Sequence, residues 1–205
     1  MSLETWLVFA FLCFMAGVSP GPAVFLTISN VIRFGRRAAI ISGSANAIGL
    51  VVLGLCIGYG LGGLMQASAF AFTMVKIVGG AYLVWLGIKS WRATGNFIAA
   101  EGGEIAPDEV SLFRTSFILS ITNPKAIVIM GAMFPAFMQA ESSLWLQSAI
   151  MATTYAFMCF IVHYAIAYMG EYIRPFFQSS QRLKYLRRVI GSLFVGFGLT
   201  LVATR

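Results

Sequence analysis

The chain has 205 residues, of which 59% are hydrophobic and 10% are charged, and its mean hydropathy is +0.86. A soluble domain of this size carries about 25% charged residues. The fourteen Lys and Arg, seven Asp and Glu and one His therefore cannot cover a water-facing surface. So much apolar sequence also excludes disorder. The composition predicts an integral membrane protein.

The net charge of +7 does not indicate a nucleic-acid-binding protein, because the basic residues form short clusters between long apolar runs. That placement is typical of loops that face anionic lipid. The first apolar run carries Glu4, lacks a basic n-region and continues into a proline motif instead of a cleavage site, so we do not interpret it as a signal peptide.

Six apolar segments cover residues 3–31, 38–65, 70–88, 112–138, 144–169 and 189–203. Crossing about 30 Å of hydrocarbon takes roughly 20 helical residues. The first segment is interrupted in its middle and the fourth near its start. The sixth is short, but it extends to residue 183 if Arg187 and Arg188 snorkel to the membrane interface. We therefore predict an all-α protein with six transmembrane helices.

Basic residues mark one side of the predicted bundle. Eleven of the fourteen lie in or beside the first, third and fifth connections, and the second and fourth connections have none. The positive-inside rule makes the marked side cytoplasmic, so both termini are expected to face outward. The eleven residues are Arg33, Arg36, Arg37, Lys89, Arg92, Arg114, Arg174, Arg182, Lys184, Arg187 and Arg188.

The long third connection, residues 93–111, is typical of a flexible cytoplasmic linker between two halves, 1–92 and 112–205. Because each half holds three helices, the second half must enter the membrane in the opposite sense, as in inverted-repeat transporters. A weak internal similarity supports this arrangement. The sequence GAYLVWLG at 80–87 aligns with GSLFVGFG at 191–198.

Proline interrupts the first and fourth segments. Proline lacks a backbone N–H and clashes with the preceding turn, and the freed polar groups must face protein or a water-filled cavity. We predict Ser19 and Asn123 as N-caps, with Pro20 and Pro124 at the first helical positions. Two half-helix N-termini inside the membrane would suit a carboxylate; the alternative is a pair of structural kinks. The motifs are Ser19-Pro20-Gly21-Pro22 and Asn123-Pro124-Lys125.

Few polar side chains lie within the predicted spans, which makes each a candidate. Lys76 and Lys125 cost at least about 2.5–3.5 kcal/mol at depth on insertion scales, so they should face the bundle interior or snorkel to an end. Asn46 is either a site residue or a partner in an interhelical hydrogen bond. A substrate hydroxyl would find a partner in Asn46 or Tyr82. Glycines spaced four apart on the second predicted helix indicate close packing, and they are Gly54, Gly58 and Gly62.

No carboxylate lies in the body of a predicted span, so a proton relay through buried Asp or Glu is not visible. The candidates for carrying a coupled proton are Lys125, His163 and Glu171. His163 is otherwise a hydrogen-bonded packing residue. Catalytic triads, metal-binding motifs and Walker-type loops are missing from the sequence, so we predict no enzyme, cofactor or metal site.

Two other functional classes remain open at this point. A membrane redox protein or thiol-electron carrier would need two of Cys13, Cys56 and Cys159 to meet, but they fall in different segments without a CxxC motif. They are equally interpretable as small apolar residues. A membrane subunit without transport of its own is the second class.

Several motifs together carry a family resemblance. The pieces are SPGPA at 19–23, GRR at 35–37, GAYL within 76–87, NPKA at 123–126, FPAF at 134–137, and Arg188 with Gly191 and Gly198. In these, nearly the whole chain resembles the LysE/RhtB family of bacterial amino-acid exporters.

The resemblance implies a six-helix inner-membrane protein that expels small amino acids from the cytoplasm, driven by the proton gradient. Residues 19–22, Lys76 and 123–125 match the family's signature. Members that export basic amino acids carry a carboxylate in the second helix, and residues 38–65 have none. This departure favours neutral substrates such as threonine, homoserine or branched-chain residues. Both a single chain and a homo-oligomer remain open.

Overall fold

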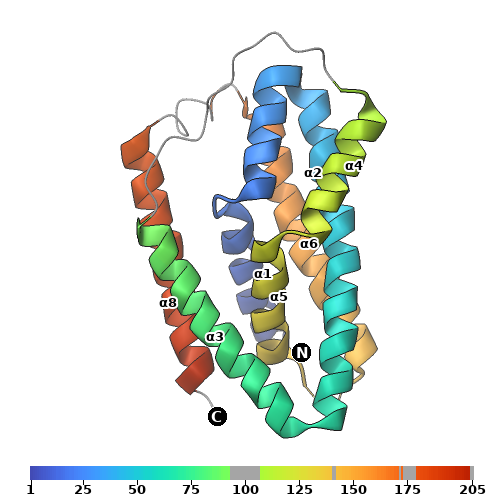
Figure 1. Cartoon of the computed structure of the whole chain (residues 1–205), viewed down its shortest axis with the longest axis vertical. Helices are drawn as coiled ribbons and strands as arrows, with labels where there is room; N and C mark the ends of the chain where they lie inside the picture. The colour runs from blue at the N-terminus through green and yellow to red at the C-terminus, as the bar shows by residue number, and fades with distance from the viewer. Residues whose placement is uncertain (93–106, 140–141, 171, 173–178, 204–205) are drawn as a thin grey trace.

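The computed structural model describes residues 1–92, 107–139, 142–170, 172 and 179–203, and these form helices without any strand. Most of the predicted linker, as well as Glu171, lies outside the described residues. Figure 1 shows the described helices as one bundle. They are α1 (Leu3–Val18), α2 (Pro22–Ala67), α3 (Ala69–Arg92), α4 (Glu109–Ile121), α5 (Pro124–Phe137), α6 (Leu144–Tyr168) and α8 (Ser180–Ala203).

Helix α2 has two arms, joined at Gly35. This glycine has φ 83° and ψ −179°, a conformation that residues with a side chain rarely adopt. The chain runs away from the N-terminus as far as this turn and then returns (Figure 1). The predicted interruption between the first and second segments is therefore present, although a turn at one glycine replaces the expected loop.

The predicted fourth segment is divided into α4 and α5, which are bent by 46° at their break. Judged by length and composition, Pro22–Leu61 and Leu144–Tyr168 are long and apolar enough to cross a membrane. The bent α4–α5 pair is a third candidate if it counts as one span, and Leu3–Val18 is a shorter apolar helix. Six spans therefore stay a prediction.

Helix α8 is longer than the sequence suggested, since it begins at Ser180 and runs for 24 residues. Snorkelling was the wrong expectation for Arg187, which is buried with only 4% of its surface exposed. The neighbouring Arg188 is exposed, and its backbone carbonyl accepts a hydrogen bond from Trp91 Nε1 at 3.0 Å. Only one of these two arginines therefore faces outward.

The main core lies among α1, α2, α5 and α6. Phe9 is fully buried, with its ring centroid 6.1 Å from that of Phe134 and 5.2 Å from that of Phe137. On the side toward α6, a Cβ placed on Gly54 would lie 2.7 Å from the Cβ of Ala152, and Gly58 meets Ser148 in the same way. The predicted close packing is confirmed at these two glycines, while the side-chain position of Gly62 lies outside the described set.

Helices α3 and α8 pack side by side along one flank of the bundle (Figure 1), and α3 also packs against α5. A Cβ placed on Gly87 would lie 2.5 Å from the Gly191 carbonyl oxygen, and one on Gly198 would lie 2.5 Å from that of Gly80. The helices are therefore antiparallel, and the two segments with internal similarity face each other. In the alignment of the two segments Gly80 corresponds to Gly191 and Gly87 to Gly198. The contact between Gly87 and Gly191 therefore corresponds to the contact between Gly198 and Gly80.

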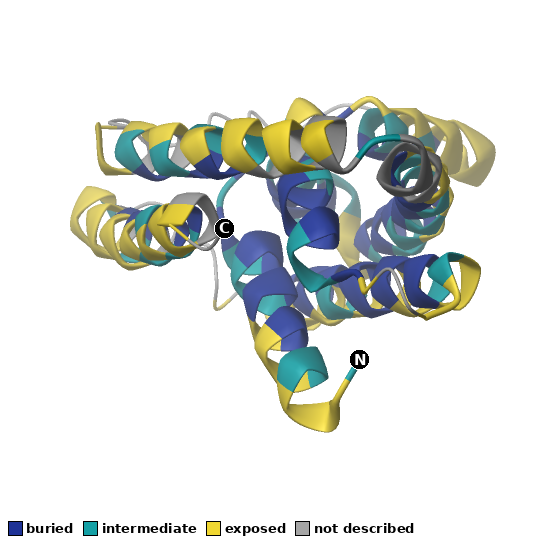
Figure 2. Cartoon of the chain, turned by 90° about the horizontal axis from the view of Figure 1, so that it is seen from below, coloured by how far each residue is buried: buried dark blue, intermediate teal, exposed yellow. Residues whose placement is uncertain are grey.

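The exposure of the side chains follows the packing of the helices. Figure 2 shows buried residues on the faces that the helices turn toward one another and exposed ones on the outer faces. Many of the exposed residues are large and apolar, including Phe11, Phe70 and Phe157 at 52%, 74% and 58%. An apolar outer surface suits lipid, whereas a water-soluble bundle would expose charge.

Candidate functional site

The first break separates α1 from α2. Ser19 follows the last residue of α1, and its N–H donates to Met15 O at 3.0 Å. The next helix begins at Pro22, and the Phe25 N–H donates to Gly21 O at 3.0 Å. The prediction of Ser19 as N-cap is therefore wrong. Pro20 forces Ser19 into an extended conformation, and Pro22 takes the first helical position instead.

The second break separates α4 from α5 and follows the prediction. The Asn123 side chain accepts a hydrogen bond from the Lys125 N–H at 3.1 Å, which makes Asn123 the N-cap. Pro124 occupies the first turn of α5. Asn123 is buried, so this cap stabilises a helix N-terminus inside the bundle.

Lys125 joins the two breaks. Its Nζ donates to Ala16 O at 2.8 Å and to Ser19 O at 2.5 Å, and both carbonyls belong to the end of α1. The last carbonyls of a helix lack intrahelical partners and carry partial negative charge, so an ammonium is a suitable partner there. Lys125 therefore holds the first residues of α5 against the last residues of α1.

A cavity of about 340 Å³, here called the break cavity, opens beside these contacts. Eight of the predicted site residues line it, which brings both proline motifs and Tyr82 together. They are Ser19, Pro20, Gly21, Pro22, Tyr82, Asn123, Pro124 and Lys125. The structure adds five residues that the sequence reasoning did not include, namely Phe25, Trp85, Lys89, Arg187 and Phe194.

The added residues come mostly from α3 and α8. The Tyr82 and Trp85 ring centroids are 5.0 Å apart, and Lys89 Nζ lies 4.8 Å from the Trp85 centroid. Helical spacing relates these residues, because side chains seven positions apart lie on the same face of a helix. Lys89 lies seven residues after Tyr82, and Phe194 lies seven residues after Arg187. The described lining of the break cavity thus holds three cationic side chains and no Asp or Glu.

A second, smaller cavity of about 30 Å³ lies between α1, α2, α5 and α6, and we call it the Asn46 cavity. Asn46 lines this space and does not line the break cavity. His163 also borders it, and its Nδ1 is 2.6 Å from Thr27 Oγ1. The hydrogen bond within the bundle, one of the two alternatives for His163, is therefore present, and a role in carrying a proton stays a prediction.

Two predicted candidates cannot be placed. Lys76 belongs to α3, but its side chain lies outside the described set, as does all of Glu171.

The cysteines are free thiols, with Cys13 and Cys159 in the main core and Cys56 exposed. Among the described residues no group of three or more His, Cys, Asp and Glu side chains could hold a metal ion.

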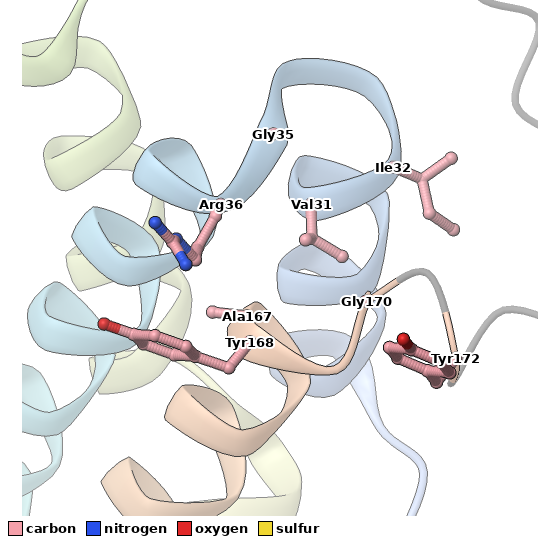
Figure 3. Close-up of a pocket in the computed structure, with 8 residues that line it drawn as sticks. All are labelled: Val31, Ile32, Gly35, Arg36, Ala167, Tyr168, Gly170 and Tyr172. Atoms are coloured by element: carbon pink, nitrogen blue, oxygen red, sulfur yellow. The ribbon is translucent and has the colours of Figure 1, made fainter.

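An open cavity of about 540 Å³ lies near the Gly35 turn, where α2 meets the end of α6. Figure 3 shows Arg36 beside Tyr168 and Val31 facing Gly170. The Arg36 guanidinium lies 4.7 Å from the Tyr168 ring centroid. This cavity shares no lining residue with the break cavity, so it does not extend the site between the two breaks.

Comparison with known proteins places the chain in a family. Residues 14–205 match the family described as LysE type translocator. The chain belongs to the LysE family. The family resemblance seen in the proline motifs is thereby confirmed over almost the whole sequence, and this LysE-family chain is a membrane protein.

Curated relatives match the LysE-family chain over nearly its full length. It is 31% identical over 207 residues to the homoserine/homoserine lactone efflux protein of Salmonella typhimurium, covering 100% of this chain and 99% of the relative. It is 29% identical over 187 residues to the leucine efflux protein of Enterobacter sp., covering 90% and 88%. An uncharacterized membrane protein of Vibrio cholerae is 29% identical over 205 residues, all of both chains. No solved structure matches the chain.

Proposed function

We propose that this LysE-family protein exports small neutral amino acids from the cytoplasm by alternating access, with the break cavity as the substrate site. The observation that carries the proposal is the composition of that cavity. Its volume of about 340 Å³ lies within the usual range of small-molecule sites, roughly 300–1,000 Å³. Its described lining has basic and aromatic side chains and no acidic one, which suits a molecule that carries a carboxylate.

Within this cavity, Arg187 is the residue that we assign to the substrate carboxylate. Arg187 is buried and lines the cavity. A guanidinium binds a carboxylate through two parallel hydrogen bonds, which a lysine cannot match. Lys89 adds positive potential, and the Tyr82 and Trp85 rings offer an apolar surface with one hydroxyl for the substrate side chain.

The relatives support neutral substrates, because two of them are named for the efflux of homoserine or leucine. The second arm of α2 carries no carboxylate that would pair with a basic substrate. We therefore assign homoserine, threonine and branched-chain amino acids to this site. A zwitterion carries no net charge, so a coupled proton would supply the driving force, with Lys125, His163 and Glu171 as candidate carriers.

The proposal includes an orientation in the inner membrane. Six spans would form two inverted repeats, residues 1–92 and 112–205, joined by a cytoplasmic linker at 93–111. The clustering of eleven basic residues in alternate connections supports this orientation. In Figure 1 the turn between the two arms of α2 and the start of α4 lie at the end of the molecule away from both termini.

Transport by purified protein in proteoliposomes tests the function. Labelled homoserine, threonine and leucine should move in response to an imposed pH gradient, whereas lysine should not. Arg187→Gln should reduce transport by about 10-fold or more, because hydrogen bonds to charged groups contribute about 1.5–3 kcal/mol. Arg188→Gln is the matched control, since Arg188 does not line the break cavity. Failure of the parent protein to move any of the three neutral amino acids would overturn the proposal.

A further inference from the structure

The Asn46 cavity lies directly behind the break cavity. Gly21, Asn123 and Lys125 line both spaces, so they form the wall between them. A Cβ on Gly21 would lie only 3.1 Å from Lys125 Cδ, which shows how closely the lysine side chain crosses this wall. A volume of about 30 Å³ has room for one or two water molecules but not for an amino acid.

Asn46 presents an unsatisfied acceptor in this cavity. Only 4% of its surface is exposed, and among the described residues its Oδ1 has no hydrogen-bond partner. Buried polar groups of this kind are usually satisfied by an ordered water when the space is polar and large enough. The Asn46 cavity meets both conditions.

Groups that can donate to a water or accept from one surround the same space. Lys125 Nζ uses two of its three N–H groups at Ala16 and Ser19, which leaves one for another partner. His163 has Nδ1 against Thr27, so Nε2 is the ring nitrogen left for a partner in the cavity. The first turn of α2 also borders the cavity through Ala23 and Val24, where helical N–H groups lack intrahelical acceptors.

We propose that the Asn46 cavity is a hydrated proton site in which Asn46 holds water between Lys125 and His163. The proposal rests on the export function proposed above and adds the place where the proton is carried. The other titratable side chains near it are Tyr155 and Cys159, which line it, and Cys13, which lies in the adjoining core. No described lining residue is a carboxylate.

One positive charge is shared within this site. When the proton moves, an N–H bond at Lys125 breaks and an N–H bond at His163 forms through the water, with no change in oxidation state. Two full charges around so small a space would repel each other, so protonation of one group opposes protonation of the other. Because Lys125 also holds the end of α1 and lines the break cavity, the position of the proton affects the substrate site.

The single histidine of the chain gives a test that needs no substrate. Protein labelled with ¹⁵N-histidine gives one pair of ring signals, which belong to His163. Asn46→Ala should shift those signals, because the water held by Oδ1 is lost. Asn30→Ala is the matched control, since Asn30 is a buried asparagine of the same helix that bonds Ser42 and does not line the cavity. Ring signals that respond equally to both variants, or to neither, would overturn the proposal.

Transport measurements distinguish a loss of proton coupling from a loss of substrate binding. Asn46→Ala and His163→Gln should lower pH-gradient-driven accumulation of labelled homoserine or leucine by about tenfold, the scale of a typical coupling free energy. Exchange of labelled against unlabelled substrate, which needs no net proton movement, should stay near the parent rate. If accumulation and exchange fall equally, or if neither falls, the proton site is contradicted. If the parent protein transports no amino acid, the export function fails, and the ring signals still decide whether Asn46 and His163 share water.

Discussion

At the scale of single residues, Lys125 contributes to the structure as well as to the candidate site. Its position after a break would have allowed it to point a free ammonium at a substrate. In the structure the ammonium instead binds the carbonyls of Ala16 and Ser19. The positive charge is therefore partly balanced by the end of α1, and a loss of Lys125 acts first on the contact between the two breaks.

Lys125→Met should destabilise the protein as well as stop gradient-driven transport. It leaves two buried carbonyls without a donor, and a hydrogen bond from a charged group contributes about 1.5–3 kcal/mol. We expect the thermal unfolding midpoint in detergent to fall by several degrees. Lys125→Arg should recover part of this stability, yet fail to couple transport to the pH gradient, because a guanidinium keeps its proton.

Lys89→Met is the control for this prediction. Lys89 also lines the break cavity, but its ammonium lies over the exposed Trp85 ring, whereas the ammonium of Lys125 binds the carbonyls at the end of α1. Its loss should leave the unfolding midpoint close to that of the parent. Equal midpoints for the Lys125→Met and Lys89→Met variants would contradict the role of Lys125 at the end of α1.

The residues differ in how far sequence alone could place them. Asn123 was predictable as a cap because capping depends on its immediate neighbours. Ser19 was not, because the Pro-Gly-Pro sequence offers two first helical positions and local rules do not choose between them. Arg187 was missed because a charge near the end of a span suggests an interface position. Its burial depends on how α8 packs in the bundle, which the sequence does not show.

At the scale of helices, the contact between α3 and α8 relates the two halves of the chain. The weak similarity between 80–87 and 191–198 did not show that these segments touch. In the structure each glycine pair brings one backbone against the other, without a side chain between them. Small residues at such crossings let membrane helices pack closely, and each of the two segments supplies one glycine to each pair.

Gly198→Val should separate α3 from α8. The new side chain would meet the Gly80 carbonyl oxygen and Val84, and overpacking of this kind costs about 1–3 kcal/mol. We expect a lower unfolding midpoint and reduced transport. Gly196→Val is the control on the same helix, since a Cβ at Gly196 meets nothing within 4 Å. If the two variants are equally stable, the glycine contact does not hold the pair together.

At the scale of the whole molecule, the six-span arrangement is the prediction with the widest consequences. The sequence located both breaks, because proline acts locally, and the six predicted apolar segments fall largely within the described helices, because hydropathy does too. The sequence could not give the turn at Gly35 or the pairing of α3 with α8, which depend on contacts between distant segments. Nor do helix length and apolar content alone identify six spans, since α1 is only 16 residues long and α4 and α5 are separate helices.

Fusion reporters test the topology. A reporter placed after residue 102 should be cytoplasmic, and one placed after Arg205 should be periplasmic, because three spans are expected between them. Both reporters should be made at similar abundance, so that a silent fusion is not mistaken for a location. Two reporters on the same side would require an even number of spans in the second half and would exclude the inverted repeat.

The central claim is that the break cavity binds the exported amino acid, and protection from chemical labelling tests it most directly. In a variant without Cys13, Cys56 and Cys159, a Tyr82→Cys substitution places a single thiol in the lining of the cavity. Homoserine or leucine should slow its reaction with a maleimide, while lysine should not. Tyr185→Cys, at an exposed position of α8 outside the break cavity, should react at the same rate with or without either amino acid. Equal labelling of Tyr82→Cys in the presence and absence of every transported amino acid would contradict the claim.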